Sequence, residues 1–165
     1  MRILGIDPGT AIMGYGVIEA DGNRYQLLDY GCVRTKADIP MPQRLLQLHQ
    51  GITQLIQMFD PACVSVEELF FNRNVTTAVP VGQARGIVLL AAAQNELPVY
   101  EYTPLQVKQT ICGYGRAEKP QVQFMVQRLL NMQSIPKPDD AADALAIAIT
   151  HARYYATRRL RGEEV

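Results

Sequence analysis

The sequence is short of the features that mark membrane and secreted proteins. No apolar run approaches the roughly 20 residues needed to cross a bilayer, and the first residues do not resemble a signal peptide. The three cysteines, Cys32, Cys63 and Cys112, are odd in number and widely spaced, and they lack the spacing of a metal site. We therefore predict reduced cysteines in a cytoplasmic protein.

The chain also lacks an excess of either charge, because 16 basic residues balance 16 acidic ones. Net charge therefore does not indicate a nucleic-acid partner. The distribution is more informative, since positions 71–137 hold seven basic and three acidic residues, a local net charge of +4. A basic surface around clustered carboxylates suits a polyanion held over bound cations, although ordinary solvated helix faces would give a similar distribution.

The first ten residues, MRILGIDPGT, place a carboxylate in an apolar run. Ile3, Leu4 and Ile6 have the pattern of a buried strand, so Asp7 should lie in the interior of a sheet. A buried carboxylate without a partner costs several kcal/mol or shifts its pKa. Asp7 therefore needs a cationic partner or a metal, unless it only caps the turn at Pro8 and Gly9.

The 165 residues suffice for one domain with a sizeable core. Residues 1–35 predict a three-stranded antiparallel meander, and a helix follows Pro40 and Pro42. Residues 62–68 predict a buried strand that, after a right-handed crossover, runs parallel to the first. A fifth strand is expected at 97–102. The sequence thus predicts an α/β fold with a five-stranded mixed sheet and helices on both faces.

The remaining helices are predicted from apolar content and end signals. One very apolar helix should reach about residue 96 and start late because of Pro80, packing on the sheet or on another subunit. Thr103 and Pro104 begin the next helix, which ends at Gly113. Further helices are expected at about 118–131 and 138–158.

Acidic side chains occur at two more places on otherwise apolar elements. Glu67 ends the predicted strand on the face of Ser65, whereas Glu68 lies on the opposite face. Asp140 and Asp143 project from one side of the last helix, although acids at a helix start also cap it. Four carboxylates from three distant segments converge only around a cation. Oxygen ligands alone, with no histidine or cysteine pattern, indicate Mg²⁺ or Mn²⁺.

Six motifs make the chain resemble the RuvC-type Holliday-junction resolvases, which are crossover junction endodeoxyribonucleases of the ribonuclease H-like superfamily. They are GIDPGT, GYGVI, GCVRT, GQARG, VKQT and DAADALAIA, and together they span nearly the whole length. The resemblance implies that the metal-binding carboxylates are Asp7, Glu67, Asp140 and Asp143. Glu68 and Asp139 stand next to two of these acids, so each is the alternative ligand if the assignment is off by one residue. It also implies that Lys119 and Lys108 lie beside the scissile phosphate. Phe70, or its neighbour Phe71, would stack at the opened base pairs of the junction.

The expected activity is the resolution of four-way DNA junctions in recombination and repair, by hydrolysis with two Mg²⁺ ions for which Mn²⁺ can substitute. Residues 1–157 would form the nuclease domain and 158–165 a flexible tail. Arg73, Arg85 and Arg116 should contact DNA. Two symmetric cuts favour a homodimer, with residues 82–93 as the interface. The resemblance further implies a branch-migration helicase partner of the RuvA and RuvB type and a nucleoid-associated location.

Three other functions remain compatible with the sequence. A related nuclease acting on RNA or on RNA–DNA hybrids would keep the same acids but would need contacts to 2′-hydroxyls. A phosphotransferase or ATPase that shares the D-x-G-T motif would need a second, similarly folded half. A catalytically inactive junction-binding module is disfavoured because all four acids are present.

Overall fold

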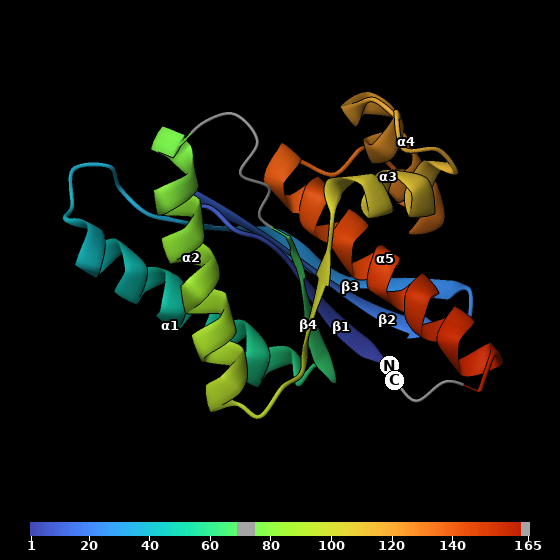
Figure 1. Ribbon diagram of the computed structural model, residues 1–165, viewed down its shortest axis with the longest axis horizontal. Helices are drawn as coiled ribbons and strands as arrows, with labels where there is room; N and C mark the ends of the chain where they lie inside the picture. Colours follow the sequence, from blue (N-terminus) through green and yellow to red (C-terminus); the bar gives the residue numbers. More distant parts are fainter. Residues whose placement is uncertain (69–74, 163–165) are drawn as a thin grey trace.

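The computed structural model describes residues 1–68 and 75–162. In order along the chain, its elements are β1 (Arg2–Asp7), β2 (Ile12–Asp21), β3 (Arg24–Arg34), α1 (Met41–Phe59), β4 (Cys63–Glu67), α2 (Val75–Gln94), β5 (Val99–Tyr102), α3 (Pro104–Cys112), α4 (Lys119–Leu129) and α5 (Asp139–Leu160). Helices α1 and α2 cover one face of the sheet, and α3, α4 and α5 cover the other (Figure 1).

The sheet has the strand order β3-β2-β1-β4-β5. Strands β1, β2 and β3 pair antiparallel, whereas β4 runs parallel to both β1 and β5. The predicted meander and the two added parallel strands are therefore confirmed. The central position of β1 follows from its composition, because a strand with a neighbour on each side and helices on both faces must be apolar almost throughout.

Side chains of β1 alternate between two cores, as the two-residue period of a strand requires. Leu4 and Ile6 pack with α1 and α2, whereas Ile3 packs with α3, α4 and α5. Gly5 faces α5 as well, since a Cβ there would overlap the Ala144 carbonyl. Asp7 continues the row of Ile3 and Gly5, so its carboxylate leaves the sheet on the side of α5.

Glycines allow α5 to lie unusually close to the sheet. A Cβ at Gly14 would overlap the Asp140 carbonyl oxygen, and a Cβ at Gly16 would overlap Leu145. Gly14 is also the register partner of Asp7 on the neighbouring strand. The first turn of α5 therefore lies on the sheet directly beside Asp7, which a larger residue at position 14 would prevent.

Helix α2 differs from the prediction. It begins at Val75, so Pro80 lies inside it, and the expectation of a start near Pro80 is wrong. A proline in a helix interior costs about 3 kcal/mol. Burial offsets this cost, because Ala84, Val88 and Ala91 on one side of α2 are fully buried against the core that α1 shares.

The other helix ends follow their local signals. Thr103 forms a capping box with Gln106 at the start of α3, and Gly113 ends that helix in the left-handed conformation, with φ of 86°. Helix α5 continues to Leu160, three residues beyond the predicted end of the domain. All three cysteines are unpaired. Among the described residues, none of the helices has the length and apolar character that a membrane span requires.

The close approach of α5 gives a first prediction. Gly14→Ala should lower the free energy of unfolding by about 1–3 kcal/mol, the usual cost of overpacking, because the new methyl group must displace the Asp140 carbonyl. Without such a clash, replacing glycine by alanine stabilises a protein by about 0.4–1 kcal/mol. Urea unfolding would measure the difference, and a variant as stable as the wild type would contradict the close approach.

Candidate active site

Strands β1 and β4 bring Asp7 and Glu67 to the same edge of the sheet. Their last paired residues are Ile6 and Val66, so the two acids follow at the same level of neighbouring parallel strands. Glu67 lies on the face of Cys63 and Ser65, as the alternation predicted, and is half-buried. Glu68 is exposed, and its backbone N–H donates to the carbonyl of Tyr102. Of the two adjacent glutamates, Glu67 is the one beside Asp7.

Helix α5 supplies the other two carboxylates. Asp140 lies in its first turn, with its backbone on Gly14, and Asp143 follows three residues later on the same side. Both are half-buried, whereas the preceding Asp139 is exposed. The structure thus brings the carboxylates of β1, β4 and α5 into one region.

The crowding of these acids shifts their pKa values. Burial, followed by the charges of Asp143, Glu67 and Asp140, raises the pKa of Asp7 to about 8, against the lowering effect of Lys119. Burial also raises the pKa of Glu67 and that of Asp143, each partly offset by Lys119. These groups cannot all be ionised at neutral pH without added positive charge.

One internal cation contributes to that charge. The Lys119 Nζ, at the start of α4, donates to Asp143 Oδ2 over 2.9 Å and lies 3.4 Å from Asp139 Oδ2. Burial would lower the pKa of Lys119, but its bonds to Asp143 and Asp139 overcome this effect and raise it. Lys119 therefore offsets part of the negative charge of Asp143 and Asp139.

The donor set fits a hard divalent cation. It consists of carboxylate oxygens only. It includes the half-buried Asp7, and among the described residues Lys119 is the only group that lowers the pKa of this acid. Within residues 1–68 and 75–162, no three acidic, histidine or cysteine side chains lie close enough to hold a metal as they stand. Among the four acids, Asp143 forms an ion pair with Lys119.

A pocket of about 230 Å³ opens beside these acids. Its charged lining consists of Glu67, Asp143, Lys108 and Lys119, and its apolar lining includes Val107 and Val122. The two lysines, one from α3 and one from α4, lower the pKa of Glu67. In this open pocket the two carboxylates can bind a metal ion, and the two lysines can bind a phosphate group. A phosphate could therefore lie between the lysines and the metal.

The other described residues that were predicted to contact DNA, Arg85 and Arg116, do not line this pocket. The side chain of Arg85 is 18% exposed, and its guanidinium forms an ion pair with Glu101 of β5. Arg116 is exposed between α3 and α4. Phe70, Phe71 and Arg73 lie outside the described residues. The roles of all of these in DNA binding stay predictions.

The sequence did not predict the contact of Asp139 with Lys119 or that of Asp139 with Gln123. Asp139 Oδ1 accepts a hydrogen bond of 3.0 Å from Gln123 Nε2, while its other oxygen faces Lys119. The spacing held a signal, because Lys119 and Gln123 are four residues apart on one helix, as Asp139 and Asp143 are on another. Pairing of the two helices could not be read from that spacing alone.

Comparison with known proteins identifies the family. The family model for crossover junction endodeoxyribonuclease RuvC matches residues 3–151. The chain belongs to the RuvC family. It is 68% identical to the crossover junction endodeoxyribonuclease RuvC of Desulfitobacterium hafniense over 152 residues, which cover 92% of each chain. It is 60% identical to that of Desulforamulus reducens over 157 residues, which cover 95% of this chain and 96% of the relative.

A solved structure extends the similarity to three dimensions. The chain superposes on Thermus thermophilus RuvC in complex with a Holliday junction substrate with a TM-score of 0.91 and 41% identity, covering 95% of this chain and 96% of the other. The predicted fold class and the resemblance to RuvC-type nucleases are therefore confirmed. RuvC proteins are metal-dependent nucleases, and this agrees with the donor set around Asp7.

The raised pKa of Asp7 predicts how stability depends on pH. Folded Asp7 keeps its proton up to a pKa of about 8, whereas unfolded Asp7 loses it near 3.8. Because the folded state binds more protons between these values, metal-free protein should lose stability as pH rises through that window. Asp7→Asn should flatten this slope and stabilise the protein at pH 8 by on the order of a few kcal/mol.

Denaturant unfolding in a chelator between pH 5 and 8.5 would measure this effect. Asp38→Asn, which removes an exposed carboxylate, is the control and should leave the slope unchanged. An Asp7→Asn protein with the same slope as the wild type would contradict the account of Asp7.

Proposed function

We propose that this protein is a structure-selective endonuclease that resolves four-way DNA junctions by metal-dependent hydrolysis of phosphodiester bonds. The observation that carries the proposal is the convergence of four carboxylates, from three distant segments, beside a pocket that two lysines line. Membership of the RuvC family and the similarity to a RuvC protein in complex with a junction support it.

The proposed ligand set is Asp7, Glu67, Asp140 and Asp143, which would hold two Mg²⁺ ions or Mn²⁺ in their place. When bound, the metal would lower the pKa of a water molecule and stabilise the leaving 3′ oxygen. Burial of Asp7 and Glu67 keeps this region partly dry, which strengthens every charge interaction in it.

The lysines act on the substrate. Lys119 and Lys108 would bind the non-bridging oxygens of the scissile phosphate and offset the charge that develops there. Their positions on α3 and α4, which pack together and on α5, fix them relative to the acids. We propose that the products carry 5′-phosphate and 3′-hydroxyl ends, as the resemblance implies.

A labelled mobile four-way junction tests the reaction. With Mg²⁺ the wild-type protein should make paired symmetric nicks, and without Mg²⁺ it should make none. Asp7→Asn should abolish cleavage while junction binding in a chelator is retained. Retained cleavage by Asp7→Asn would refute the metal assignment.

Two further substrates separate this function from related ones. Linear duplex of the same sequence and an RNA–DNA hybrid should be cut far more slowly than the junction. Preferential cutting of the hybrid would instead indicate a related nuclease that acts on RNA.

A homodimer is the finer part of the proposal, because two symmetric cuts need two sites related by a two-fold axis. Helix α2 offers the surface. Its exposed residues Val79, Gln83, Gly86, Leu90 and Ala93 recur every three or four positions, the spacing along which helices pair. The opposite side of α2 is buried against α1 and the sheet. The exposed row is the candidate dimer surface and overlaps the predicted residues 82–93.

Leu90→Arg tests this surface. Leu90 is 49% exposed, so arginine there should not disturb the fold, but it would place a charge in the dimer surface. Sedimentation velocity at micromolar concentration should show a dimer for the wild type and a monomer for Leu90→Arg. Met58→Arg, at a 71% exposed apolar residue of α1, should remain dimeric. A dimeric Leu90→Arg protein would contradict the proposed dimer surface. A wild-type monomer bound to junction DNA would contradict the homodimer itself.

A partner and a location complete the proposal. We propose a branch-migration helicase of the RuvA and RuvB type as the partner, and a cytoplasmic, nucleoid-associated location.

A further inference from the structure

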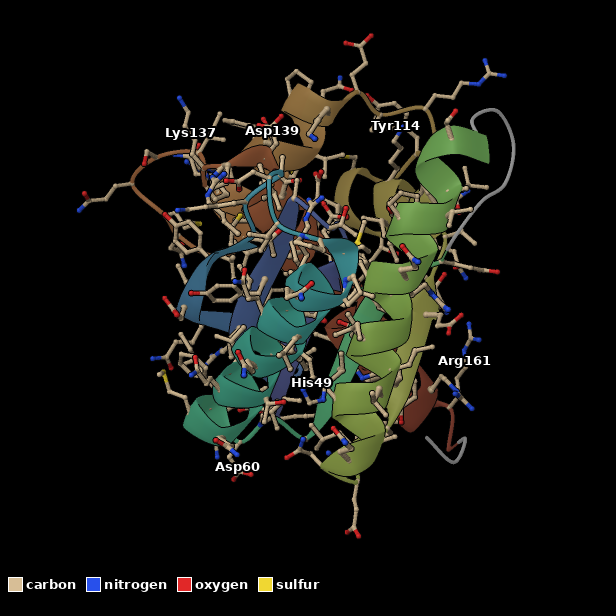
Figure 2. The ribbon with its side chains drawn as sticks, turned by 90° about the vertical axis from the view of Figure 1, so that its left-hand side faces the viewer. His49, Asp60, Tyr114, Lys137, Asp139 and Arg161 are labelled. Carbon is tan, nitrogen blue, oxygen red and sulfur yellow. The ribbon has the colours of Figure 1, made fainter. Side chains whose placement is uncertain are left out.

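Helices α4 and α5 face each other through two matched pairs of polar residues. Lys119 and Gln123 are one turn apart on α4, and Asp139 and Asp143 are one turn apart on α5. Gln123 bonds one oxygen of Asp139, and Lys119 reaches both aspartates. Figure 2 shows Asp139 at the end of the molecule opposite Asp60, together with Lys137 and Tyr114.

In this arrangement, Lys119 and a metal ion would compete for the same carboxylate. Asp143 is a proposed metal ligand, and Lys119 is proposed to bind the scissile phosphate. The Lys119 amine, bonded to Asp143 Oδ2 at 2.9 Å, occupies one of the two carboxylate oxygens through which Asp143 could bind a metal. Metal binding therefore has to compete with an ion pair inside the protein, and the released amine needs another carboxylate if it is to stay near the pocket.

We propose that Asp139 is a positioning residue that holds Lys119 over the pocket when Asp143 turns to the metal, and that Gln123 fixes Asp139 for this task. The inference rests on the proposed function, since it takes Asp143 as a metal ligand. It assigns to Asp139 a role that differs from that of its neighbour Asp140.

The surroundings of Asp139 favour this role over that of a ligand. Its side chain is 63% exposed, whereas that of the proposed ligand Asp143 is 33% exposed. One of its oxygens is occupied by Gln123, and the other lies 3.4 Å from the Lys119 amine. Asp7 senses the charges of Asp143, Glu67 and Asp140, and Asp139 is not among the groups that shift its pKa.

Binding of Mn²⁺ to the protein without DNA, measured by calorimetry, tests the proposal. Asp139→Asn should weaken binding several-fold, because Lys119 is then left with Asp143 as its sole carboxylate and competes more strongly with the metal. Lys119→Gln should tighten binding, because the competing cation is gone. Gln123→Leu should weaken binding in the same direction as Asp139→Asn, but less.

The double variant separates positioning from simple loss of charge. In a Lys119→Gln background, Asp139→Asn should change the affinity by no more than about twofold, since residues that act through each other are not additive. An equal loss in both backgrounds would overturn the proposal and make Asp139 a direct electrostatic contributor. Glu68→Gln, which removes an equal charge next to Glu67, should also have an effect of about twofold or less.

A second measurement reports the accessibility of the Lys119 amine. In protein saturated with Mn²⁺, an acylating reagent should label Lys119 several-fold faster in Asp139→Asn than in the wild type, as mass spectrometry would show. Equal labelling rates would overturn the proposal. Neither measurement uses cleavage, so a protein that shows both effects but does not cut junctions would refute the proposed function and leave the role of Asp139 standing.

Discussion

Repulsion among clustered, half-buried carboxylates is the constraint on which the rest of the structure depends. Asp7 lies at the end of a fully packed central strand, and burial with three acidic neighbours raises its pKa to about 8. Like charges in such a place are stable only if they are protonated or share cations. Lys119 supplies one positive charge, which is fewer than the surrounding acids need. We propose that this shortfall makes the region a site for divalent metal.

The backbone brings these carboxylates together. Parallel pairing of β1 and β4 sets Glu67 level with Asp7, and the glycines at positions 5, 14 and 16 allow α5 to bring its aspartates down onto the sheet. Helix α5 is then fixed by a core of alanine, leucine and isoleucine that is almost wholly buried. The placement of the acidic side chains thus depends on many apolar residues that lie in the core, away from the acids.

The fold and the acids could be predicted from the sequence because their signals are local. Alternation fixed the face of Glu67, and the apolar run around Asp7 indicated its burial. The start of α2 was mispredicted because tertiary packing outweighs the local cost of Pro80. The contact of Asp139 with Lys119 could not be predicted, for a related reason. Its role depends on α4 lying beside α5, and no property of residues 139–143 reveals which helix packs against them.

Anomalous diffraction from crystals grown with Mn²⁺ tests the central claim most directly. The account predicts manganese peaks bound by Asp7 together with Glu67, Asp140 or Asp143, and an Asp143 carboxylate no longer bonded to the Lys119 amine. Saturating manganese that leaves the Asp143–Lys119 ion pair intact, with no ion beside Asp7, would contradict the account.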